Sequence, residues 1–112
     1  MQLFKVITLP EAEQFLESMP LKASAKMLYN IRKASNGVRD VELFKKLENC
    51  EIWEFRTLYM GIAYRLFAFW DMDEQTMVIA THGIIKKTQK TPKKEIAKAE
   101  TIRKQYFENK KL

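Results

Sequence analysis

Three short β-rich runs, separated by hairpin-length breaks, constrain the fold of this 112-residue chain most strongly. They cover residues 51–58, 63–70 and 76–83, and each one mixes β-branched, aromatic and polar residues in the manner of a strand. Runs joined by connections as short as "YMG" and "DMDEQ" pair as an antiparallel meander. The pattern predicts an antiparallel sheet with helices packed on it.

Helical patterns flank this meander along the chain. Residues 10–19 open with a proline and carry two glutamates in the first turn, and residues 21–35 follow and stop at an Asn-Gly pair. Residues 91–111 form the last predicted helix, with Thr91 as its N-cap and Pro92 in its first turn. The apolar stripes are expected to be Leu21, Ala25, Leu28 and Ile31 in the second helix, and Ile96, Ala99, Ile102 and Tyr106 in the last.

The remaining segments complete the predicted domain. Residues 3–7 alternate and predict a first strand, whereas residues 38–50 predict a loop with a short turn of helix. The expected order is strand, helix, helix, three strands and helix, which is an α+β domain over residues 1–112. A chain of this length holds one ordinary core.

The cysteine count and the lengths of the apolar runs indicate the cellular compartment of the protein. Cys50 is the only cysteine, which excludes an internal disulfide and fits a reducing compartment. The first residues lack a signal-peptide pattern, and no apolar run reaches the roughly 18 residues of a membrane span. We expect a cytoplasmic protein without a metal or a cofactor.

Positive charge gathers in the last quarter of the chain. Residues 1–85 hold ten Lys or Arg and eleven Asp or Glu, whereas residues 86–112 hold ten and three. The whole net charge of +6 therefore comes from the second segment. Such asymmetry indicates a polyanion, most often nucleic acid, or an acidic protein partner; a solvated basic helix is the alternative.

Two arginines interrupt neighbouring predicted strands. Alternation puts Glu54 and Arg56 on the face opposite to Trp53 and Phe55, and it gives Arg65 a position on the same open face as Arg56. Like charges side by side repel unless something negative joins them. The negative group is either Glu54, in a surface ion pair, or a bound anion such as phosphate, which suits planar guanidinium groups.

The segment after the third run combines a histidine with a dense basic loop. His82 is the only histidine, and its pKa lies near neutrality, although a lone histidine at a strand end is more often structural. Lys93 and Lys94 fall in the first turn of the last helix, an end that favours anions. The converging loop residues are Lys86, Lys87, Thr88, Lys90 and Thr91. They either bind a sugar–phosphate backbone or extend into water.

The runs "IWEFR", "YRLFAFWD" and "HGIIKKTQKTPKKEIAKA", in this order of elements, resemble the RelE/ParE superfamily of toxins from bacterial type II toxin–antitoxin systems. The resemblance is strongest to its phage-derived Gp49-like (HigB-type) branch. It covers nearly the whole chain, and residues 52–99 carry its specificity. It implies a RelE-like fold and a ribosome-dependent mRNA endonuclease. Cleavage in such enzymes proceeds by attack of the ribose 2′-OH and needs no metal.

The resemblance also implies roles for the residues found above. Arg65 would stabilise the transition-state phosphate, and Arg56 would bind phosphate or orient Arg65. Lys86 and Lys87 would bind phosphate or act as the acid, and His82 or Glu54 would be the general base. Residues expected to hold the RNA backbone are Lys90, Lys93, Lys94, Thr88 and Thr91.

The chain departs from the best-studied RelE members at three places. Those members carry two catalytic lysines in the first meander strand, where this chain has Ile52 and Glu54. Their C-terminal catalytic tyrosine has no counterpart here, because Tyr106 lies on the predicted apolar stripe. The identity of the acid and the base is therefore left open.

Two other functions fit the same fold. A ParE-like toxin inhibits DNA gyrase by binding and does not need the basic surface, and a non-toxic phage-derived protein would bind nucleic acid alone. The resemblance implies a cognate antitoxin, usually with a helix-turn-helix, as partner. An acidic antitoxin segment would be attracted to the basic residues 86–112.

Overall fold

The computed structural model describes residues 2–74, 76–88 and 90–111. Its elements follow in the order β1 (Lys5–Thr8), α1 (Pro10–Ser18), α2 (Leu21–Ser35), β2 (Phe44–Lys46), β3 (Trp53–Tyr59), β4 (Ile62–Trp70), β5 (Met77–Lys86) and α3 (Lys93–Lys110). The predicted α+β class and the RelE-like arrangement of helices on a sheet are confirmed. No helix in the described part of the chain is both long enough and apolar enough to cross a membrane.

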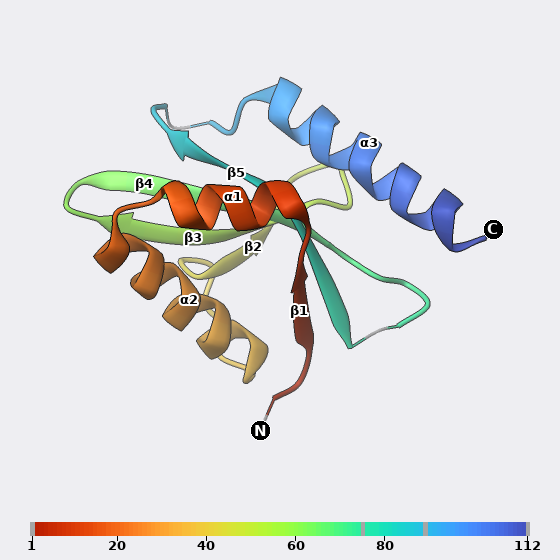
Figure 1. The fold of residues 1–112 in the computed structure, drawn as a ribbon, viewed down its shortest axis with the longest axis horizontal. Coiled ribbons are helices and arrows are strands. Elements are labelled where there is room, and N and C mark those ends of the chain that lie inside the picture. The colour runs from red at the N-terminus through yellow and green to blue at the C-terminus, as the bar shows by residue number, and fades with distance from the viewer. Residues whose placement is uncertain (1, 75, 89, 112) are drawn as a thin grey trace.

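The five strands form one mixed sheet in the order β1-β5-β4-β3-β2 (Figure 1). The meander of β3, β4 and β5 is antiparallel, as predicted, and a two-residue turn with positive φ at Met60 and Gly61 closes its first hairpin. The prediction of a purely antiparallel sheet is wrong, because β1 lies parallel to β5. The predicted loop of residues 38–50 contains one helix-like turn, in which the N–H groups of Leu43 and Phe44 donate to the carbonyl of Asp40. The prediction missed the edge strand Phe44–Lys46, which pairs with β3.

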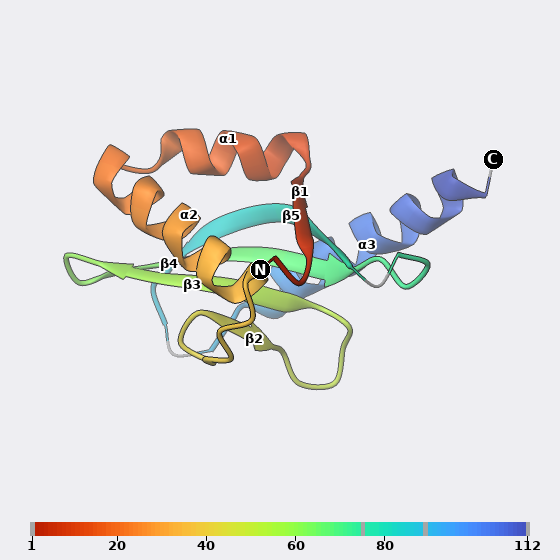
Figure 2. The same ribbon diagram turned by 90° about the horizontal axis from the view of Figure 1, so that it is seen from below.

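Each face of the sheet has its own core. Helices α1 and α2 cover one face (Figure 2), where the aromatic ring of Phe55 and the side chains of Leu66 and Val78 are buried. Helix α3 covers part of the other face, over Phe67 and Phe69. The bounds of α2 agree with the prediction, but the stripe predicted for it is wrong. The buried side chains are Ala23, Met27, Asn30, Ile31, Ala34 and Ser35, whereas Leu21, Ala25 and Leu28 are exposed.

A buried carboxylate fixes the C-terminal half of α3. Asp71 follows β4 directly, and its Oδ2 accepts hydrogen bonds from the hydroxyl of Tyr106 (2.6 Å) and the ammonium of Lys110 (2.8 Å). Burial opposes its ionisation, but the bonds from Lys110, Tyr106 and two backbone N–H groups outweigh burial and lower the pKa of Asp71 to about 2. Burial, followed by the bond to Asp71, raises the pKa of Tyr106 to about 12. Tyr106 thus joins the helix to the sheet through both its ring and its hydroxyl.

The Asp71 contact makes the stability of the folded chain depend on pH in the acid range. Because the pKa of Asp71 is lowered in the folded state, its contribution is complete above the ordinary value of 3.8 and is lost as the pH falls through about 2. We expect Asp71→Asn to lower the free energy of unfolding at neutral pH by about 1–3 kcal/mol. The difference in unfolding free energy between Asp71→Asn and wild type should become smaller in strong acid. Urea titrations over a pH series measure it, with the exposed Glu17→Gln as control; parallel pH profiles for wild type and Asp71→Asn would contradict this account.

Candidate functional site: a guanidinium cluster on the α3 face of the sheet

The predicted neighbours Arg56 and Arg65 face each other across β3 and β4. They are register partners, and Glu54 pairs with Phe67 one step along the same face. The Nε atoms of Arg56 and Arg65 lie 3.7 Å and 3.4 Å from the same oxygen of Glu54. Glu54 and Arg65 are almost fully buried, and Arg56 is half-buried. One carboxylate therefore separates two guanidinium groups that would otherwise repel.

The hydrogen bonds of the two guanidinium groups are incomplete. Arg65 donates from Nη1 to the carbonyl of Tyr64 (3.1 Å), and Arg56 donates from Nη1 to the carbonyl of Val41 (2.9 Å). The buried Nε of each has no hydrogen-bond partner in the described part of the chain. Burial and the nearby Arg56 lower the pKa of Arg65, whereas Glu54 opposes that shift. Two guanidinium groups beside one carboxylate leave a net positive charge, which a phosphate or another oxyanion would neutralise.

Two lysines extend this positive surface. Lys86 ends β5 on the same face; burial lowers the pKa of its ammonium, with Glu54 opposing and Arg65, Arg56 and Lys45 adding to the shift. Lys45 belongs to the edge strand β2 and is the register partner of Glu54. The sequence analysis missed Lys45, because residues 38–50 carry no recognisable strand pattern. We name the set Lys45, Glu54, Arg56, Arg65 and Lys86 the guanidinium cluster.

A β-bulge in β5 brings Lys86 to this face. Register partners run from Leu66 opposite Gly83 to Ala68 opposite Ala80, so that two residues of β5, Thr81 and His82, oppose one residue of β4. The extra residue reverses the alternation beyond it. Gly83 consequently turns toward α1, where any Cβ would overlap the ring of Phe15.

The same bulge directs His82 beneath α3. The prediction had β5 end at residue 83, whereas His82 lies within the strand and is 3% exposed. Its Nδ1 is 2.9 Å from the Thr81 hydroxyl, and its Nε2 is 3.1 Å from a carboxylate oxygen of Glu95 in the first turn of α3. Burial lowers the pKa of His82, although the bond to Glu95 opposes this. His82 thus anchors the start of α3.

In the basic loop before α3, one side chain contacts the guanidinium cluster and the lysines beyond Lys86 are exposed. Pro92 caps α3, and Thr91, predicted as the N-cap, instead donates to Oε2 of Glu54 (3.3 Å). Thr88 bonds to the carbonyl of Lys90 within the loop. The remaining lysines are exposed; they are Lys87 and Lys90 in the loop and Lys93 and Lys94 in the first helical turn.

The described residues hold no group of three His, Cys, Asp or Glu side chains arranged to bind a metal ion. The arrangement instead offers guanidinium and ammonium groups around a single buried carboxylate, and burial lowers the pKa of both Arg65 and Lys86. Chemically, guanidinium and ammonium groups in this arrangement are able to bind an oxyanion and to stabilise negative charge that develops on it.

Gly83→Ala tests the bulge. The added methyl group meets Phe15, so we expect a loss of about 1–3 kcal/mol in the free energy of unfolding. Replacing Phe15 by Leu in the same chain should recover part of the loss, because the shorter side chain leaves room for the methyl group. Chemical denaturation of the two single variants and the double variant measures this coupling. Additive losses would contradict the predicted contact.

Glu54→Gln tests the compensation of the two arginines. Without the carboxylate the buried guanidinium groups repel, and we expect a loss of about 3 kcal/mol in unfolding free energy. Inorganic phosphate should stabilise this variant more than wild type, because the anion supplies the negative charge that the introduced amide lacks. The control is Glu51→Gln, whose exposed pair with Lys46 should contribute less than about 1 kcal/mol. Equal phosphate responses of Glu54→Gln and wild type would count against an anion site.

Comparisons with known proteins agree with this architecture. The solved structure of the toxin–antitoxin complex RelBE2 from Mycobacterium tuberculosis contains a chain that aligns with a TM-score of 0.50 over 79% of this chain and 97% of that one. Sequence identity is 20%, so the likeness shows a shared fold. No curated protein sequence matches the chain significantly. Residues 14–104 match the family described as phage derived protein Gp49-like (DUF891), and the chain therefore belongs to the Gp49-like family.

Proposed function

We propose that the protein is the toxin of a type II toxin–antitoxin system and acts as an endoribonuclease on mRNA at the ribosome. The observation that carries this proposal is the guanidinium cluster, where Arg56 and Arg65 share one carboxylate and Lys45 and Lys86 add further positive charge. Membership of the Gp49-like family and the RelE-like fold support it. The similar fold comes from a structure titled a toxin–antitoxin complex, which favours an antitoxin as a partner of this chain too.

The proposed reaction is a transesterification within the RNA. The ribose 2′-oxygen attacks the adjacent phosphorus, the bond to the 5′-oxygen breaks, and the products carry a 2′,3′-cyclic phosphate and a 5′-hydroxyl. A base takes the proton of the 2′-OH and an acid gives one to the leaving oxygen. Arg65 and Arg56 would neutralise the charge that builds up on the phosphate. We propose that no metal takes part in the chemical step.

We assign proton transfer to the groups that would lie nearest the bound phosphate. Lys86 suits the acid, because burial lowers the pKa of its ammonium and so eases loss of the proton. For the base, Glu54 lies among the phosphate-binding cations, whereas His82 is buried under α3 with both nitrogens engaged. The proposal therefore favours Glu54, which also positions both arginines.

The exposed basic residues beside the cluster fit a larger polyanion. We propose that Lys87, Lys90, Lys93 and Lys94 contact the message or ribosomal RNA backbone, together with Thr88. Thr91 contributes indirectly, by holding Glu54. The protein would act in the cytoplasm, and a helix-turn-helix antitoxin would supply DNA binding for the pair.

Cleavage is tested with purified protein, ribosomes and a defined mRNA, with primer extension to map the cuts. We expect wild type to cut and Arg65→Lys to cut at least about tenfold more slowly, because one ammonium cannot replace the two-pronged guanidinium. Lys87→Ala should weaken RNA binding with a smaller effect on the cutting rate.

The matched control is Arg32→Ala, which removes an exposed arginine from α2 on the opposite side of the sheet. Its cutting rate should equal that of wild type. Folded wild type that never cuts mRNA, with or without ribosomes, would refute the proposal. Equal loss in Arg32→Ala and Arg65→Lys would show that overall charge, and not the cluster, is responsible.

A further inference from the structure

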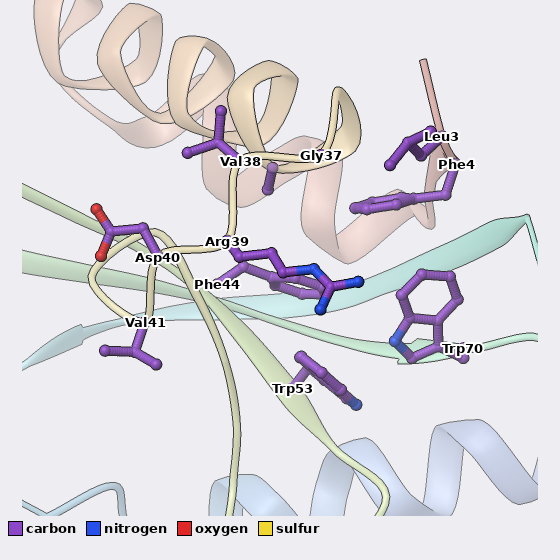
Figure 3. A pocket seen from close by; sticks show the side chains of 11 residues that line it. Leu3, Phe4, Gly37, Val38, Arg39, Asp40, Val41, Phe44, Trp53 and Trp70 are labelled. Carbon is purple, nitrogen blue, oxygen red and sulfur yellow. The ribbon is translucent and has the colours of Figure 1, made fainter. Parts of the chain in front are cut away.

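A hollow of about 510 Å³ opens at the opposite face of the sheet from the guanidinium cluster (Figure 3). Its floor consists of Phe4, Phe44, Trp53 and Trp70, and its rim is the segment of residues 37–41 that follows α2. We name this hollow and its extension past Trp70 the aromatic groove. It uses none of the five residues of the guanidinium cluster.

The floor is a packed aromatic layer. The ring of Trp53 stacks on Phe44 with centroids 4.7 Å apart, and Phe4 meets Trp70 edge-on at 4.9 Å. Because the rings hold one another, the floor keeps its shape without an occupant. Along the rim and at the entrance, Leu3, Val38 and Val41 expose 55%, 44% and 60% of their surface. Apolar residues gathered at a preformed hollow mark a contact surface for another molecule.

The groove continues past Trp53 and Trp70. A second hollow of about 160 Å³ shares both tryptophans and is bordered by Met72 and Arg103. A third, of about 370 Å³, shares Met72 and Arg103 and reaches Phe107 near the end of α3. The path is therefore elongated, with an aromatic floor at one end and a mixture of apolar and charged side chains beyond Trp70, which suits an extended chain better than a small molecule.

The charges beside this path are mostly positive. Of the carboxylates bordering it, Glu51 lies 3.9 Å from Lys46, and Asp73 lies 3.5 Å from Lys110. Arg39 and Arg103 form no ion pair with any described residue, and Arg103 lies over the ring of Phe107 instead. Figure 3 shows the guanidinium group of Arg39 reaching across the aromatic floor, while the carboxylate of Asp40 points away from it. Carboxylates of an occupant would meet two unpaired arginines here.

We propose that the aromatic groove docks an extended acidic segment of another protein. Bulky apolar side chains of the segment would enter the hollow over Trp53 and Trp70, and its Asp or Glu residues would pair with Arg39 and Arg103. A second copy of this chain is a poor occupant, since each copy carries +6. RNA is also disfavoured, because a face of Trp53 is already covered by Phe44 and so is not free to stack on a base.

The proposal stands apart from RNA cleavage. If the protein is a toxin as proposed above, its antitoxin is the protein expected to bring this segment. Docking is nevertheless tested on the purified chain alone, without ribosomes or message, so that either proposal can fail while the other holds.

The first test is a selection from a displayed library of random short peptides, with the full chain as bait. Enriched peptides should combine Leu, Ile or Phe with Asp or Glu. The double variant Arg39→Ala/Arg103→Ala should fail to retain them. A selection that enriches nothing, or that enriches basic or uncharged peptides, overturns the proposal.

Binding of an enriched peptide without Trp is then measured by intrinsic fluorescence. The chain has two tryptophans and both line the groove, so their emission reports on its occupancy. We expect a saturable change, and a Kd raised about tenfold in Arg39→Ala/Arg103→Ala. Arg32→Ala, the control, should bind as wild type does. An unchanged Kd in the double variant would place the peptide elsewhere.

Two further readouts do not depend on the variants. Backbone amide shifts of the wild-type chain on peptide binding should concentrate at residues 37–44, Trp53 and Trp70. A short single-stranded RNA should leave the tryptophan emission unchanged. Shifts concentrated on the basic loop before α3, or RNA binding that requires Arg39, would replace this proposal with a nucleic-acid surface.

Discussion

The pairing of Glu54 with Arg56 and Arg65 is the interaction on which the α3 side of the molecule depends. Two guanidinium groups at register positions of neighbouring strands repel, and a single carboxylate makes the arrangement tolerable. The other oxygen of that carboxylate accepts a hydrogen bond from the hydroxyl of Thr91, which lies just before α3. Glu54 therefore both compensates the charge of the two arginines and holds the residue that precedes α3.

Helix α3 has few apolar contacts for its length, and polar contacts secure each end. Glu95 meets His82 near its start, and Tyr106 and Lys110 meet Asp71 near its finish. The opposite face relies on a larger apolar core beneath α1 and α2. The sheet thus separates a polar surface from an aromatic one. Arg56 of the cluster links the two, because it donates to the carbonyl of Val41 at the edge of the groove.

Alternation along strands and helical spacing predicted much of this arrangement. The bounds of α2, the antiparallel meander and the apposition of Arg56 with Arg65 follow from local pattern, and the structure confirms them. The parallel pairing of β1, the edge strand β2 and the aromatic groove depend on contacts between distant segments, which local pattern does not contain. The stripe predicted for α2 failed because Met27 and Asn30 face the sheet while the larger Leu21 and Leu28 do not.

The bulge at Thr81 and His82 makes the end of β5 sensitive to residue number as well as residue type. With the bulge, Lys86 shares a face with Arg65. If the same chain paired without the bulge, regular alternation would turn Lys86 toward α1 and carry Lys87 onto the face of Arg65. Within a run that reads "IIKKT", such a one-residue slip would exchange one lysine for another on this face. The repeated lysine therefore makes the positive charge of this surface robust to a change in register.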